Sequence, residues 1–253
     1  MTDIAIHRSL RVRGRRARLA TLLGVVLLLP LVVLLAACST SAGGGGTDDI
    51  VSQVRLVDGE RFVYRLLDLD GELVGRGTFT TTRNGDTFEL RQSYADLAPA
   101  GAGSVVDESL VVVDAATLQP VTMQRTIQPR GGDDARTGEL RLREHYYEDQ
   151  SSLWLWRTLA FDEDLELRYT AVDPREGSQV TAALMQVDRQ LRETPAGSFD
   201  SWVIQIRTGR ETVNVWVHVQ PPHEVVRFDN GRLFFELESV EVPAPQTGKR
   251  RGR

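Results

Sequence analysis

The chain contains one thiol, Cys38, and this is its most distinctive reactive side chain. The chain has 253 residues, of which 41% are hydrophobic and 26% charged, as is typical of a folded globular protein. A single cysteine excludes an intramolecular disulfide and a zinc site built on thiolates. Cys38 therefore has no chemical partner within its own chain.

The histidines and serines do not form patterns typical of catalysis or metal binding. His145 lacks the second histidine of a His-Glu-x-x-His zinc motif. His218, His223 and Glu224 could share a metal only if the turn between them folded back, because ligands must converge on one point. No Gly-x-Ser-x-Gly elbow surrounds the candidate nucleophiles Ser109, Ser151, Ser152 and Ser201. We therefore predict a protein that is not an enzyme and that uses no metal and no cofactor.

The tryptophans are better suited to binding than to catalysis. Trp154 and Trp156 alternate with leucines, so a strand over residues 153–161 would place both rings on one face, near Tyr147. A concave apolar face with a few polar groups is typical of ligand pockets. We name Trp154, Trp156, Trp216 and Tyr147 as candidate lining residues. The alternative is that these rings fill the protein core.

Residues 1–37 have the pattern of an export signal. Six arginines precede residue 19 against a single acid, Asp3. Residues 19–35 then form an apolar run that is interrupted only by Thr21, Gly24 and Pro30. A basic stretch that leads into such a run is typical of a secretory signal peptide.

The apolar run ends in Leu35-Ala36-Ala37-Cys38, which resembles the lipobox of bacterial lipoproteins. The resemblance implies a Cys38 thiol that carries diacylglycerol, cleavage before Cys38, and attachment to the membrane through acyl chains such as palmitate. Two or more acyl chains make such an anchor stable. The expected location is the extracytoplasmic face of the cell membrane, or the outer membrane in a cell that has two. The alternative is an uncleaved signal anchor, since about 20 apolar residues span a bilayer.

The rest of the chain divides into a tether, a domain and a tail. Residues 38–49 hold the modified cysteine and four consecutive glycines, which predicts a flexible tether. A β domain is expected over residues 50–243, and residues 244–253 are expected to form a basic disordered tail. Without residues 1–37 the chain has 24 Lys and Arg against 34 Asp and Glu, a net charge of −10. We expect no nucleic-acid partner, because such a surface repels phosphates.

Residues 50–243 alternate apolar and polar side chains with a period of two, which predicts antiparallel strands. Asp70-Gly71 and Asn84-Gly85 lie between such runs and predict tight hairpins with these residues at the centre. Both helical and strand spacing fit residues 179–192, and we favour a strand. The other expected strands are 61–69, 72–82, 86–95, 105–113, 119–128, 138–148, 153–161, 165–172, 199–208, 212–220, 224–228 and 233–240.

Several segments resemble a family of uncharacterised bacterial envelope β proteins. They are Gly59-Glu60-Arg61-Phe62-Val63-Tyr64, Gly75-Arg76-Gly77, Pro195-Ala196-Gly197-Ser198-Phe199 and Val215-Trp216-Val217. The resemblance implies a mostly β fold with a single curved antiparallel sheet or half-barrel, similar to the LolA and LolB carriers. This sequence has no stretch that matches the helical lid of those carriers.

Two functions follow as expectations. The first is non-catalytic binding or transport of an apolar envelope molecule such as a lipid. The alternative is a structural or interaction module that docks a protein partner at an open sheet edge. A hollow apolar interior would favour the first function, and a filled interior with an exposed edge would favour the second.

Overall fold

The computed structural model describes residues 50–95, 104–129, 136–141, 147–148, 151–161, 164–173, 178–209 and 211–244. The predicted export signal, tether and most of the tail lie outside these residues, as do Cys38 and His145.

The domain is mostly β, as predicted, with a single large sheet. Its strands are β1 (Arg61–Leu67), β2 (Leu73–Asn84), β3 (Thr87–Ala95), β4 (Ser104–Asp114), β5 (Pro120–Pro129), β6 (Arg136–Arg141), β7 (Tyr147–Glu148), β8 (Glu166–Asp173), β9 (Ser178–Thr194), β10 (Gly197–Thr208), β11 (Glu211–His218), β12 (Val225–Asp229) and β13 (Phe234–Glu241).

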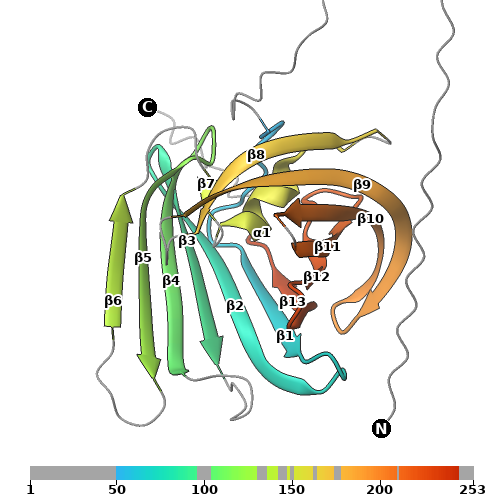
Figure 1. Ribbon diagram of the computed structural model, residues 1–253, viewed down its shortest axis with the longest axis horizontal. Helices are drawn as coiled ribbons and strands as arrows, with labels where there is room; N and C mark the ends of the chain where they lie inside the picture. The colour runs from blue at the N-terminus through green and yellow to red at the C-terminus, as the bar shows by residue number, and fades with distance from the viewer. Residues whose placement is uncertain are drawn as a thin grey trace, which may run out of the picture. The chain divides into compact units, whose positions relative to one another are not determined.

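The strand order is β6-β5-β4-β3-β2-β1-β13-β12-β11-β10-β9-β8-β7. Every neighbouring pair is consecutive in the chain except β1 and β13, whose pairing joins the two ends of the domain. All pairs are antiparallel except β7 with β8. The sheet is strongly curved and unclosed, with β6 and β7 as its edges (Figure 1).

The turn between β2 and β3 is the loop Gly85-Asp86, because Asn84 pairs with Thr87. Gly85 has a positive φ of 61°, whereas Asn84 and Asp86 do not. A single positive φ at the first central residue is the pattern of a type II′ turn, which favours glycine there. The predicted hairpin is confirmed, but its central residues lie one position later than expected.

The strand predicted over residues 153–161 is wrong. Ser152–Leu155 forms a short α-helix, α1, and Trp156–Thr158 continues it as a 3-10 helix, η1. All seven of these residues are buried, so the segment has no exposed face for its leucine and tryptophan alternation to match. Because successive helical residues do not alternate by face, Trp154 and Trp156 point in different directions.

The ambiguous residues 179–192 are a strand, as favoured, within the seventeen-residue β9. The single strand predicted over 138–148 is wrong, because β6 and β7 lie at opposite edges of the sheet. Tyr147 therefore lies next to β8 and not in a hairpin with the segment that carries Trp154.

The main core lies between one face of the curved sheet and the α1–η1 segment, which Figure 1 shows inside the curve. Phe62, Phe79, Leu90, Ile204 and Leu237 project into it from five strands. The backbone N–H of Ser52 donates to the carbonyl of Thr158 at 2.8 Å, so the residues before β1 pack over the segment. In the described part of the chain, no helix has the length and hydropathy needed to cross a membrane.

Candidate functional site

A buried ion pair holds the α1–η1 segment against the sheet. Arg157 in η1 contacts Glu60, just before β1, through two hydrogen bonds, Nη1 to Oε1 at 2.8 Å and Nη2 to Oε2 at 3.0 Å. The Arg157 side chain is 3% exposed and that of Glu60 is 0% exposed. The Arg157 guanidinium also lies 4.6 Å from the centre of the Phe62 ring. This bidentate pair joins the inserted segment to the first strand.

A chain of hydrogen bonds extends from this ion pair. The Thr81 hydroxyl donates to Glu60 Oε1 at 3.0 Å, and Trp154 Nε1 donates to Thr81 Oγ1 at 2.8 Å. The Tyr64 hydroxyl, nearby in the same interior, donates to the Val225 carbonyl at 2.9 Å. Burial raises the pKa of Tyr64 far above its usual value of 10, so this phenol stays a neutral donor. Each of these buried polar groups has a hydrogen-bond partner within the protein, so their role is structural.

The interior contains three of the four predicted lining residues. Trp154, Trp156 and Tyr147 are 1%, 5% and 1% exposed, and all three belong to the packed core. Trp156 and Tyr147 meet at Tyr169, whereas Trp154 packs on Phe79. The pocket beside Trp154 has a volume of about 10 Å³, the room of one water molecule. These three rings therefore pack as the alternative in the sequence analysis expected, as part of the filled protein core.

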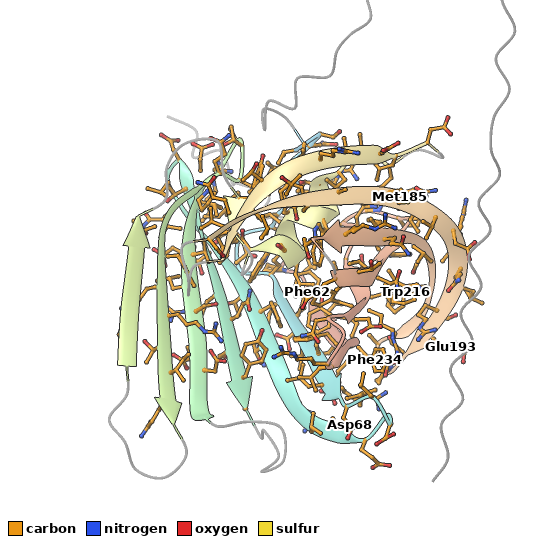
Figure 2. All side chains as sticks on the ribbon, in the orientation of Figure 1. Phe62, Asp68, Met185, Glu193, Trp216 and Phe234 are labelled. Atoms are coloured by element: carbon orange, nitrogen blue, oxygen red, sulfur yellow. The ribbon has the colours of Figure 1, made fainter. Side chains whose placement is uncertain are left out.

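Trp216, the fourth predicted residue, lies on the opposite face of the sheet. Its neighbours on β11, Val215 and Val217, point into the core, so the alternation turns Trp216 the other way. Trp216 is partly exposed and its Nε1 donates to Gln190 Oε1 on β9 at 3.1 Å. Figure 2 shows Trp216 and Phe234 inside the arc that β9 and β10 make. This face is the one part of the predicted site that a ligand could reach.

Two arginines, Arg192 and Arg227, lie beside the Trp216 ring, and a third, Arg65, shares the carboxylate of Glu236 with Arg227. We call Arg65, Arg192 and Arg227 the arginine cluster. The guanidinium carbons of Arg192 and Arg227 lie 5.2 and 5.9 Å from the centre of the Trp216 ring. Arg227 also lies 4.2 Å from the centre of the Phe234 ring. Cation–π contacts of this kind stabilise a guanidinium that is shielded from water.

One carboxylate, Glu236, contacts the cluster. Its Oε1 lies 3.4 Å from Arg227 Nη1, and its Oε2 pairs with Arg65 Nη2. Arg192 forms no ion pair with any described residue. Burial, and then the charge of Arg192, lower the pKa of Arg227, and the effects of Glu236 and Asp229 oppose this only in part. Three positive charges with one contacting carboxylate leave the cluster with a local excess of positive charge.

The sequence did not reveal this cluster, because its members come from three strands. Strand pairing places Trp216 opposite Arg227, Arg227 opposite Glu236, and Glu236 opposite Arg65, in one row across the sheet. Residues directly opposite each other in a sheet share a face. The only local signal was the polar alternation that turns each of these side chains away from the core.

The predicted absence of a metal site stays a prediction. His218 Nδ1 lies 3.3 Å from Glu224 Oε2, and His223 Nδ1 contacts the His218 carbonyl at 2.9 Å. Among the described residues, no three His, Cys, Asp or Glu side chains gather closely enough to hold a metal ion. Burial lowers the pKa of His223, which packs beside the stacked rings of Phe161 and Trp202.

No protein-family model matches the chain, and no curated protein resembles it in sequence. Among solved structures, a "putative lipoprotein" of Parabacteroides distasonis aligns over 76% of this chain and 100% of its own, with 13% identity and a TM-score of 0.34. A "putative exported protein with YmcC-like fold" of Bacteroides fragilis aligns over 76% and 99%, with 13% identity and a TM-score of 0.31. At these values neither likeness bears on the fold or the function of this chain.

Proposed function

We propose that this chain is an extracytoplasmic lipoprotein, anchored through Cys38, whose β domain binds an envelope molecule with an apolar part, such as a lipid, without transforming it. The binding role rests on one observation: the partly exposed Trp216 ring lies beside Arg192 and Arg227. These residues lie on the face of the sheet opposite the main core, which we call the open face. The anchor rests on the lipobox Leu35-Ala36-Ala37-Cys38 at the end of an export signal.

The open face suits a ligand better than the sheet interior does. Trp154 and Trp156 are already covered by protein, and the pocket beside Trp154 holds about one water molecule. By contrast, the Trp216 ring is reached from solvent and has an apolar neighbour in Phe234, whose ring shares Arg227 with it. Binding here would need no movement of the α1–η1 segment.

The second candidate function is docking of a protein partner at a sheet edge. Strand β7 pairs with β8 only at Ala171 and Val172. In the described part of the sheet, β6 and β7 are the two edge strands, and each pairs with a neighbouring strand on one side only. An unpaired edge can accept an extended peptide as an added strand.

Replacement of Cys38 tests the anchor. We expect Cys38→Ser to shift the protein from the membrane fraction to the soluble fraction or to leave it unprocessed, because no other thiol can accept diacylglycerol. Fractionation with mass spectrometry of the N-terminus measures this. Retention in the membrane of a cleaved Cys38→Ser product would disprove the lipoprotein assignment.

Contact quenching tests the ligand site. A fatty acid brominated on its chain, or its uncharged methyl ester, should quench tryptophan emission of the purified protein with saturation. Trp216→Phe should remove most of the quenching, because Trp216 is the predicted contact. Trp202→Phe is the matched control, since Trp202 is stacked on Phe161 at 4.3 Å and should leave the quenching largely intact. Absence of saturable quenching by either compound would favour the docking function.

A further inference from the structure

The arginine cluster contains buried polar groups that lack partners. The Nε atoms of Arg65, Arg192 and Arg227 are inaccessible to solvent and form no hydrogen bond with the described residues. A buried hydrogen-bond donor without an acceptor lowers the stability of the folded state, so such groups are uncommon in native proteins. Three of them in one cluster, two beside the Trp216 ring and one on the shared Glu236, indicate that an acceptor completes this site.

The charge of the cluster indicates what kind of acceptor that is. Glu236 is shared between Arg65 and Arg227, and Arg192 contacts the Trp216 ring without a carboxylate. The nearby Asp229 is itself held by the N–H of Gly231 at 2.8 Å. Arginines prefer oxyanions such as phosphate and carboxylate, which accept several N–H donors at once.

An apolar row lies beside the charged row. Strand pairing places Phe234 opposite Leu67, and Leu67 opposite Leu73, on the same face as Arg65. Leu73 is 48% exposed, and Leu67 and Phe234 are partly exposed. A ligand whose oxyanion lies at the arginine cluster could therefore extend an apolar chain across these side chains on the same face of the sheet.

We propose that the arginine cluster binds the oxyanion of an anionic amphiphile, a phosphate or carboxylate group on an apolar chain, and that Phe234, Leu67 and Leu73 receive the chain. This inference rests on the proposed function and specifies its ligand class. Arg192 is the main recognition residue, because no protein carboxylate competes for it among the described residues. Glu236 occupies the cluster partly in the free protein and limits its affinity for anions.

The test compares the brominated fatty acid with its methyl ester on the full-length protein in detergent. We expect the acid to bind about tenfold or more tightly than the ester, since hydrogen bonds to charged groups are the stronger ones. Arg192→Gln should remove most of this preference. The control Arg61→Gln changes the same charge on the same strand face as Arg65, but Arg61 is paired with Glu241 and the preference should persist.

A second variant moves the affinity in the opposite direction. Glu236→Gln removes the contacting carboxylate and should strengthen binding of the acid severalfold, while binding of the ester stays constant. This gain cannot be mimicked by partial unfolding, and thermal melts of each variant report its fold.

Competitors identify the source of the oxyanion. An alkyl phosphate that displaces the acid better than a fatty acid of equal chain length would identify a phosphate headgroup, and the reverse order would identify a carboxylate. Inorganic phosphate that binds as tightly as the alkyl phosphate would overturn the role of the apolar row. Equal affinities for acid and ester would overturn this inference and leave the proposed function standing, whereas failure of both to bind would overturn the proposed function.

Discussion

Arg157→Met should lower the free energy of unfolding by about 3–5 kcal/mol, because it leaves the buried Glu60 carboxylate without a counter-charge. Small domains are stable by about 5–15 kcal/mol, so this loss is a large fraction of the total. Urea unfolding followed by tryptophan fluorescence measures it. The Met side chain keeps most of the volume and the contact with Phe62, so the result reports on the charge.

Two companion variants make this result interpretable. Glu60→Gln combined with Arg157→Met removes both charges and should be more stable than Arg157→Met alone, because no unpaired ion is left in the core. Arg61→Met breaks an exposed ion pair, in which the side chain of Arg61 is 41% exposed and that of Glu241 is 65% exposed. It should lower the free energy of unfolding by less than about 1 kcal/mol. Equal losses for Arg157→Met and Arg61→Met would show that the buried pair has no special role.

Trp154→Ala should destabilise the domain by about 3–5 kcal/mol, the usual range for removal of a large buried aromatic side chain. Trp154 is 1% exposed, packs on Phe79 and donates to Thr81. Trp154→Phe restores much of the volume but not the N–H, so its smaller loss measures the hydrogen bond. Thermal or urea unfolding gives both values.

The hydrogen-bond chain also predicts coupling. Trp154 reaches Glu60 through Thr81, so the effects of Trp154→Phe and Arg157→Met should not add. Trp202→Phe is the control, since Trp202 belongs to a separate stack with Phe161 and its effect should add to that of Arg157→Met. Additive losses for Trp154→Phe and Arg157→Met would contradict a connected network.

The sequence by itself determined most of the strands and most of the order in which they pair. A period of two is a local property, and β-hairpins join neighbours in the chain, so alternation and turn residues were sufficient for a meander. The hairpin at Gly85 was predicted on this basis, whereas the spacing of residues 179–192 fitted both helix and strand, and the family resemblance favoured the strand that is found there as β9. Cys38 could likewise be singled out, because the lipobox that residues 35–38 resemble is a contiguous motif.

Only the tertiary structure decided the position of residues 152–158 and the composition of the candidate site. Alternation cannot distinguish a strand from a short helix that is buried on all sides, so Trp154 and Trp156 were assigned to one face in error. The arginine cluster depends on the register of β1, β9 and β12 and on the pairing of β1 with β13. Such contacts join residues far apart in the chain, and no local pattern of side chains encodes them.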